Sequence, residues 1–126
     1  MPTLFSPLVL GSLEVPNRIF MAPLTRCRAE AGDVPGELMA THYAQRAGAG
    51  LLIAEATMAI AGNCAFPGAP GVHSEAQIAG WRKVTDAVHA RGGRIFLQIW
   101  HGGRACHPLC NGGQQSVSSC AVPIDG

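Results

Sequence analysis

Two short segments combine an apolar run with side chains that donate or accept hydrogen bonds. The first is residues 21–25, Met-Ala-Pro-Leu-Thr, and the second is residues 96–101, Phe-Leu-Gln-Ile-Trp-His. Each lies where a predicted strand gives way to a loop, and in parallel α/β folds ligands bind at the carboxyl ends of strands. The hydroxyl of Thr25, the primary amide of Gln98 and the indole of Trp100 are therefore the first candidates for a binding site.

The sequence that must position these residues alternates between strand and helix patterns. Apolar runs bounded by Gly, Pro and polar residues predict strands at residues 8–10, 13–15, 18–22, 51–54 and 94–99. The first two form a hairpin around a two-residue turn at Gly11-Ser12. A long loop rich in Gly, Pro and Ala is predicted from residue 56 to about residue 73.

Two helices are predicted between the strands. The first spans residues 37–47, and the second follows Ser74, which with Gln77 makes a capping box, and ends at Gly92-Gly93. Helical spacing in the second predicts a buried stripe at Ile78, Trp81, Val84, Thr85 and Val88. We therefore assign Trp81 to the core and not to a site.

The alternation predicts an α/β fold with parallel strands joined by right-handed crossovers. Three strands could begin an open sheet of the flavodoxin type or a (β/α)₈ barrel. No G-x-G-x-x-G motif follows the first of these strands and no P-loop occurs, which disfavours the common nucleotide-binding folds. A barrel needs at least ~200 residues, so a chain of 126 residues cannot close one. The predicted fold is an incomplete (β/α)₈ TIM barrel: an N-terminal hairpin and the first three βα units.

Composition narrows the function further. Charged residues make up 13% of the chain, against roughly 25% in an average soluble domain, which suits strands covered on both faces. The net charge of +1 gives no reason to expect nucleic acid as a partner. We also expect no membrane partner, because no apolar stretch approaches the ~20 residues of a span. No secretory signal pattern is visible, so we expect a cytoplasmic location.

The five cysteines are an odd number at irregular spacings, which disfavours a disulfide framework and favours a reducing compartment. One cluster contains side chains that can bind zinc, namely His101, Cys106, His107 and Cys110. Its spacing lacks the regular pairs of structural zinc sites. We expect no metal there.

Taken in order along the chain, the motifs resemble the Old Yellow Enzyme family of FMN-dependent ene-reductases. The matching segments are residues 4–8 with the hairpin, 17–18 with 21–26, 43–47, 53–57, 81–88 and 98–104. Each match is weak alone, but together they cover almost the whole chain in the expected order. Residues 1–126 are then the N-terminal part of an FMN-binding TIM-barrel oxidoreductase domain.

The resemblance assigns a role in cofactor binding to the first strand end. The hydroxyl of Thr25 would donate a hydrogen bond to the flavin C4 oxygen, which stabilises the anionic reduced flavin. Pro23, Leu24 and Ala56 would contribute backbone groups or close packing to the isoalloxazine ring. The alternatives are that Thr25 bonds its own loop and that Ala56 is an ordinary strand residue.

At the third strand end, the resemblance places Gln98 on the flavin pyrimidine ring, whose edge both donates and accepts hydrogen bonds as a primary amide does. Trp100 would line the substrate pocket. The alternatives are a solvent-facing amide and a packing indole. His101 and Arg104 belong to the same motif but could simply hold the loop.

The implied activity is reduction of activated alkenes such as enones, with NADPH as the reductant and FMN as the cofactor. The family's carbonyl-binding pair, proton-donating tyrosine and phosphate loops have no counterpart in residues 1–126, and Tyr43 does not match the proton donor. The alternatives are a catalytically incompetent fragment or interaction module, completed by the missing C-terminal segment or by another copy of itself, and a small independent binding domain.

Overall fold

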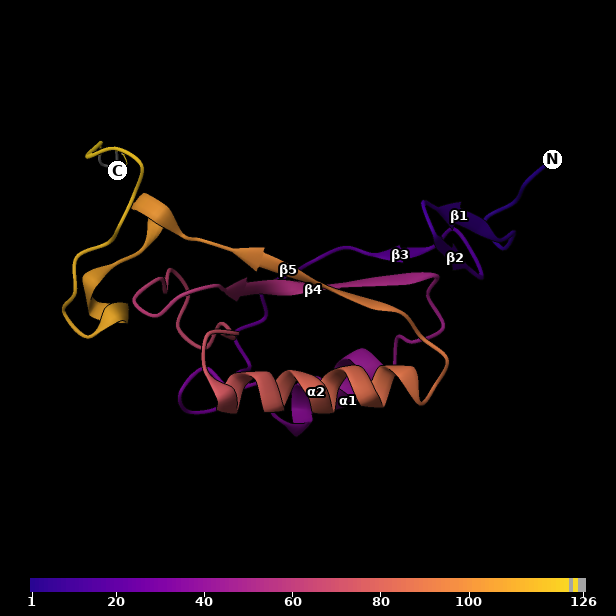
Figure 1. Cartoon of the computed structure of the whole chain (residues 1–126), viewed down its shortest axis with the longest axis horizontal. Helices are drawn as coiled ribbons and strands as arrows, with labels where there is room; N and C mark the ends of the chain where they lie inside the picture. Colours follow the sequence, from indigo (N-terminus) through magenta and orange to yellow (C-terminus); the bar gives the residue numbers. More distant parts are fainter. Residues whose placement is uncertain (123, 125–126) are drawn as a thin grey trace.

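A three-stranded parallel sheet backed by two helices forms the centre of the computed structural model, which describes residues 1–122 and 124 (Figure 1). The sheet has the order β3-β4-β5, with β3 at Phe20–Met21, β4 at Leu51–Met58 and β5 at Ile95–Trp100. The carboxyl ends of β4 and β5 point to the side of the molecule where the C-terminal segment lies. Strands β3 and β5 are the two edges of this sheet.

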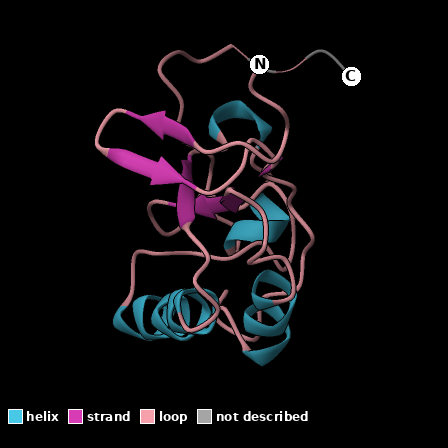
Figure 2. Cartoon of the chain, turned by 90° about the vertical axis from the view of Figure 1, so that its right-hand side faces the viewer, coloured by secondary structure: helices cyan, strands magenta, loops and turns pink. Residues whose placement is uncertain are grey.

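Both helices lie on the same face of the sheet, as the end-on view in Figure 2 also shows. Helix α1 spans Glu37–Ala44 and α2 spans Glu75–His89. The predicted capping box is present: Gln77 N–H donates to Ser74 Oγ at 3.3 Å, and Gln77 Oε1 accepts from Ser74 N–H at 3.2 Å. These bonds satisfy backbone donors that the first turn of a helix leaves unpaired, so they fix where α2 begins.

The hairpin lies at the amino ends of the strands. Strands β1 (Leu8–Leu10) and β2 (Leu13–Val15) pair antiparallel, as predicted, and Gly11 supplies the positive φ (+60°) of the turn. Asn17 then joins the hairpin to the sheet, because its Oδ1 accepts from Gly50 N–H at 2.8 Å. A Cβ on Gly50 would collide with the Asn17 carbonyl oxygen, so this approach requires glycine.

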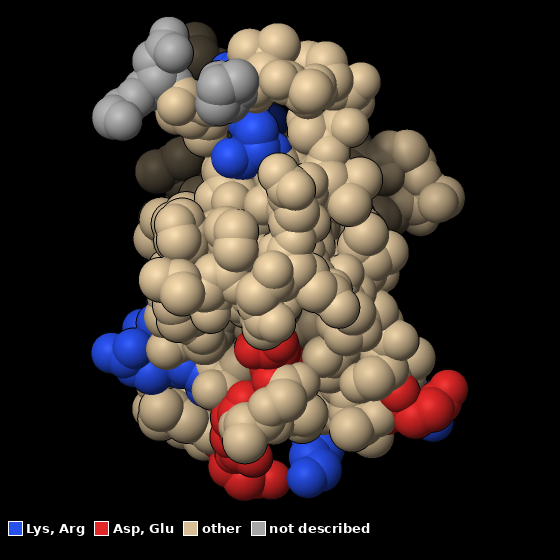
Figure 3. Space-filling model, turned by 90° about the vertical axis from the view of Figure 1, so that its left-hand side faces the viewer, with Lys and Arg blue, Asp and Glu red and all other residues tan. Residues whose placement is uncertain are grey.

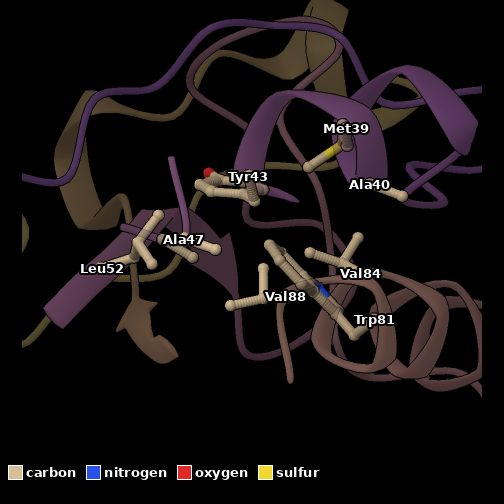
Figure 4. Close-up of a cluster of buried hydrophobic side chains, with 9 residues drawn as sticks. Met39, Ala40, Tyr43, Ala47, Leu52, Trp81, Val84 and Val88 are labelled. Carbon is tan, nitrogen blue, oxygen red and sulfur yellow. The ribbon is translucent and has the colours of Figure 1, made fainter. Parts of the chain in front are cut away.

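The hydrophobic core lies between the sheet and the two helices (Figure 4). Tyr43 of α1 and Trp81 of α2 meet there with their ring centroids 6.3 Å apart. The buried members of the cluster are Met39, Ala40, Tyr43, Ala47, Leu52, Ala54, Trp81, Val84 and Val88. The assignment of Trp81 to the core is therefore confirmed, and its indole N–H donates to Gly71 O at 3.1 Å.

A β-bulge in β4 changes which of its side chains face the helices. Ile53 pairs with Phe96, but the next pair in register is Ala56 with Gln98, so two residues of β4 oppose Leu97. Leu97 packs against the helix-side core. Because side chains alternate along a strand, Phe96 and Gln98 face the opposite side of the sheet, which we call the open face. The bulge brings Ala56 into register with Gln98.

Several predicted boundaries were wrong. The strand predicted at 18–22 is only two residues long, and the strand predicted at 51–54 continues to Met58, through part of the predicted loop. It continues because the bulge restores pairing with β5. Helix α1 ends at Ala44 instead of residue 47, and β5 runs one residue further than predicted, to Trp100.

Only two complete βα units occur in the part of the chain that the structure describes. After β5 come two short 3₁₀ helices, η1 (Gly103–Ala105) and η2 (Pro108–Asn111), where the prediction of three βα units requires a third α-helix. Residues 123, 125 and 126 lie outside the described residues, so the predicted domain limit at residue 126 is not described. Neither α1 nor α2, nor any other described helix, is long and apolar enough to cross a bilayer.

Candidate functional site

The carboxylate of Glu55 is completely buried beside the bulge and connects three elements. Its Oε2 accepts a hydrogen bond from the Arg26 backbone N–H at 3.1 Å. Its Oε1 accepts from Arg26 Nη2 at 3.0 Å and from the Tyr43 hydroxyl at 3.0 Å. Buried carboxylates are costly unless such donors surround them, so the network holds the loop after β3 and helix α1 against β4.

Tyr43 takes part in this network as donor and acceptor. Its hydroxyl donates to the Glu55 carboxylate and accepts the Glu55 backbone N–H at 2.9 Å. The Arg26 guanidinium carbon lies 5.2 Å from the centre of the Tyr43 ring, within cation–π range. Burial raises the pKa of Tyr43 to about 12, and the adjacent Glu55 charge adds to this increase. Tyr43 is thus a structural group of the core.

The same positive charge acts on His42, the neighbour of Tyr43. Burial lowers the pKa of His42, and the nearby guanidinium groups of Arg26 and Arg46 lower it further. The neutral imidazole is therefore favoured beside the network. Two buried nitrogens, Arg26 Nε and His42 Nε2, have no hydrogen-bond partner within the described chain.

The Glu55 network determines where Thr25 lies. Because Arg26 N–H is bonded to Glu55, the neighbouring residue Thr25 is held near the carboxyl-terminal half of β4, where Ala56 follows Glu55. Ala56 in turn is paired in register with Gln98. The structure therefore pairs two of the predicted cofactor-binding residues, Ala56 and Gln98, across β4 and β5, and places a third, Thr25, in the loop that is bonded to the residue before Ala56.

The polar groups of this arrangement are available for a ligand. Thr25 and Gln98 are each half-buried, and neither side chain has a hydrogen-bond partner among residues 1–122 and 124. Ala56 is 7% exposed, and its side chain is only a methyl group. One hydroxyl, one primary amide and a small residue between them form a donor set that fits the polar edge of a flavin.

The remaining predicted residues lie close by. Pro23 is half-buried and Leu24 is exposed, both in the loop that connects β3 to Thr25. Trp100 is half-buried at the end of β5, where it pairs with Met58. His101 Nδ1 accepts from Gly103 N–H at 3.0 Å, which supports its assignment as a residue that holds the loop.

Sequence analysis missed Phe66, which stacks on Trp100 with ring centroids 5.9 Å apart and planes 25° from parallel. Phe66 comes from the long loop after β4, which has no periodic pattern. The only signal in the sequence was a single aromatic residue within a Gly- and Pro-rich loop. The two rings together make one aromatic wall beside the candidate site.

Asn63, also missed, joins the loops that leave β4 and β5. Its Nδ2 donates to Trp100 O at 3.2 Å, and its Oδ1 accepts from Gly102 N–H at 2.6 Å and from the Cys106 thiol at 3.1 Å. The side chain is 1% exposed, so these bonds replace water. Asn63 thus fixes the backbone on which Trp100 is carried.

The face at the carboxyl ends of the strands carries few charged groups (Figure 3). Its centre is mostly uncharged, and acidic side chains gather toward the helix side of the view. No three His, Cys, Asp or Glu side chains in the described ranges are placed to hold a metal ion.

Comparison with known proteins identifies the family. Residues 3–125 match the NADH:flavin oxidoreductase / NADH oxidase family. The chain belongs to this family. The chain is also similar to a probable flavin mononucleotide-dependent alkene reductase of Leishmania infantum and to an Old Yellow Enzyme homologue, which confirms the resemblance found in the motifs.

Individual relatives are similar in sequence to this chain over nearly its full length. It is 46% identical to chanoclavine-I aldehyde reductase of Penicillium roqueforti, over 98% of this chain and 35% of that protein. It is 45% identical to 12-oxophytodienoate reductase 7 of rice, Oryza sativa, over 96% of this chain and 31% of that protein. The chain therefore spans about a third of the length of these relatives.

Solved structures give the same result. The Old Yellow Enzyme homologue of Zymomonas mobilis superposes with a TM-score of 0.94 at 47% identity, covering 99% of this chain and 35% of that one. Morphinone reductase in complex with tetrahydroNAD superposes with a TM-score of 0.91 at 51% identity, covering 97% and 34%. The hairpin, sheet and helices of this chain thus have the arrangement found in a segment of these family members.

The raised pKa of Tyr43 gives a direct test of the Glu55 network. Tyr43 is the only tyrosine, so the phenolate absorbance of the chain reports on this side chain alone. We expect a midpoint near pH 12 in the folded chain and near 10 in urea. A folded pKa above the unfolded one contributes stability below pH 10 that is lost as the pH rises through 12, by about 3 kcal/mol in total.

The matched control is Tyr43→Phe, which removes the titration and should lower the free energy of unfolding by about 1–3 kcal/mol, because Glu55 loses one donor. A folded-state midpoint equal to that in urea would contradict the burial of Tyr43 against Glu55.

Proposed function

We propose that this chain is the N-terminal part of an FMN-dependent ene-reductase that reduces enone-type substrates with NADPH. The observation that carries the proposal is the register pair of Ala56 and Gln98, next to the loop in which Thr25 precedes the Glu55-bonded Arg26, with the Thr25 and Gln98 side chains unpaired within the described chain. Family membership supports FMN and a nicotinamide reductant. The (β/α)₈ barrel that closes around the cofactor, and the cytoplasmic location, belong to the same proposal.

In this proposal the chain's residues hold the cofactor and do not make bonds. FMN, when bound, supplies the hydride that adds to the activated alkene. Thr25 donates a hydrogen bond that stabilises negative charge on the flavin, and Gln98 pairs with its pyrimidine edge. Pro23, Leu24 and Ala56 pack against the ring. Trp100 lines the substrate pocket, and Phe66 supports it by stacking.

The second candidate is a non-catalytic piece that needs another chain to complete its fold. The observation in its favour is the open face of the sheet, where the Phe20 and Phe96 side chains are 39% and 56% exposed. The edges β3 and β5 also present unpaired backbone groups to any added strand. A flavin spectrum separates the two candidates: yellow protein that bleaches with NADPH supports the first, and colourless protein supports the second.

Replacement of Thr25 by Ala tests the proposed donor. The protein to use is a chimera in which this chain is completed by the remaining part of the Zymomonas mobilis homologue, which it matches over 35% of that chain. We expect Thr25→Ala to lower the flavin reduction potential and slow reduction by NADPH, because a charge-assisted hydrogen bond of about 1.5–3 kcal/mol is lost. Thr25→Ser and Thr41→Ala, on exposed α1 surface, are the controls. An unchanged potential in a redox titration would remove Thr25 from the site.

Replacement of Gln98 by Leu in the same chimera tests cofactor retention. We expect weaker FMN binding by about 1–3 kcal/mol, since a polar edge of the flavin is left without a partner. Fluorescence titration with FMN measures the affinity, and circular dichroism shows whether the fold is kept. Gln45→Leu, at an exposed position after α1, is the control. If FMN affinity is the same in both variants, Gln98 does not face the flavin.

The chain by itself should associate through its open face. Exposed apolar side chains and two unpaired strand edges favour oligomers or aggregates over a free monomer. Sedimentation should therefore show species larger than one chain, and Phe96→Lys should shift them toward monomer. Supplying the rest of the barrel as a separate chain should yield a complex in place of the self-associated form. A monodisperse monomer that reduces enones with NADPH would contradict this expectation.

A further inference from the structure

Two cysteines that are far apart in sequence meet outside the candidate cofactor site. Cys64 lies in the loop after β4, and Cys110 lies in η2, after β5. Three hydrogen bonds hold the Cys64 backbone against η2: Cys64 N–H donates to Asn111 Oδ1 at 2.8 Å, Asn111 Nδ2 donates to Cys64 O at 3.3 Å, and His107 N–H donates to Cys64 O at 3.4 Å. Cys110 is therefore adjacent in sequence to the residue that clamps Cys64.

The two thiols also interact electrostatically, because Cys110 contributes to the raised pKa of the Cys64 thiol. Cys64 is 7% exposed and Cys110 is half-buried, and both line one cleft of about 310 Å³ together with Asp33 and His73. A small molecule in the cleft can reach Cys110 first.

Other roles for this pair are less well supported. A metal site needs further ligands, and no group of three such side chains is formed anywhere in residues 1–122 and 124. Cys106 is a competing thiol that also interacts electrostatically with Cys110, but its S–H donates to Asn63 Oδ1 at 3.1 Å and the residue is 8% exposed. Cys106 is thus committed to the turn beside Trp100 and leaves Cys64 and Cys110 as the reactive pair.

We propose that Cys64 and Cys110 are a redox-active pair that forms a reversible disulfide between the loops leaving β4 and β5. The thiolate of Cys110 attacks a small disulfide such as oxidised glutathione, which releases one glutathione and leaves a mixed disulfide on Cys110. The thiolate of Cys64 then attacks the Cys110 sulfur and expels the second glutathione. Two protein S–H bonds are replaced by one S–S bond, and the oxidant takes up the two electrons and two protons.

The order of attack follows from burial. Burial, with a further contribution from Cys110, raises the pKa of the Cys64 thiol to about 11. Cys64 therefore remains protonated at neutral pH and reacts second, when proximity to the mixed disulfide compensates for its low thiolate content. Closure would fix Asn63, the neighbour of Cys64, and with it the Trp100 backbone that Asn63 holds. The oxidation state of the Cys64–Cys110 pair would thus affect the position of Trp100 in the aromatic wall.

The test is differential alkylation of the full chain. The reduced chain is treated with oxidised glutathione, quenched in acid, alkylated with N-ethylmaleimide, and separated on a non-reducing gel to isolate monomers. Trypsin leaves Cys64 on the peptide 47–82 and Cys110 on the peptide 105–126. We expect loss of two of the five alkylatable thiols, a cross-link between these two peptides, and its reversal by dithiothreitol.

Variants identify which cysteines are joined, because the peptide 105–126 also carries Cys106 and Cys120. The cross-link should disappear in Cys64→Ser and Cys110→Ser and persist in the matched controls Cys106→Ala and Cys120→Ser. Wild-type chain oxidised in urea provides a comparison that needs no variant, and it should give scrambled pairs that include Cys27. A cross-link that persists in Cys110→Ser, glutathione adducts without closure, or identical pairing with and without urea would each overturn the proposal.

Discussion

The buried carboxylate of Glu55 is the constraint on which the positions of the other groups depend. A charge without water requires nearly complete hydrogen bonding, and here the donors come from the loop after β3 and from α1. Removal of the carboxylate would leave the Arg26 guanidinium, whose side chain is 21% exposed, without its ion-pair partner. The interaction therefore sets the separation of three elements, and it does so one residue away from Thr25 and one residue away from Ala56.

The bulge in β4 allows one strand to direct Glu55 toward α1 and to pair Ala56 with Gln98. Before it, the strand alternates normally, with Leu52 and Ala54 in the helix-side core. The extra residue lets Glu55 also reach α1, and it places Ala56 in register with Gln98 on the other face. A regular strand could not direct Ala54 and Glu55 to the same side. The irregularity thus links the core of the protein to its candidate site.

Beyond the strands, side-chain amides form the hydrogen bonds that hold the loop backbone in place. Asn63 and Asn111 bond the loop after β4 to the loop after β5 at several points. Such bonds fix irregular backbone that has no ladder of its own. These bonds fix the backbone of Trp100 and hold Cys64 against η2. The aromatic wall and the thiol pair therefore depend on the same hydrogen bonds between the two loops.

Short-range patterns in the sequence were enough to predict the local elements and the family. The hairpin, the capping box of α2 and the core position of Trp81 follow from turn chemistry and periodicity, which act within a few residues. Motif order was sufficient to indicate a flavin oxidoreductase, and the family match agrees.

The way in which the strands and the loops after them are joined could not be predicted, because it depends on contacts between distant segments. The extension of β4 to Met58 and the bulge before Ala56 depend on pairing with β5, which follows about forty residues later in the chain. Likewise, the sequence shows Glu55 only as one more residue of a predicted strand. Its role as a buried hydrogen-bond acceptor is seen only in the folded chain, where Arg26 and Tyr43 donate to it. The stacking of Phe66 on Trp100 and the bonding of the Cys64 backbone to η2 arise from loops without periodicity, so no local pattern could encode them. These contacts are long-range, and their geometry is set by the sheet register and by buried hydrogen bonds.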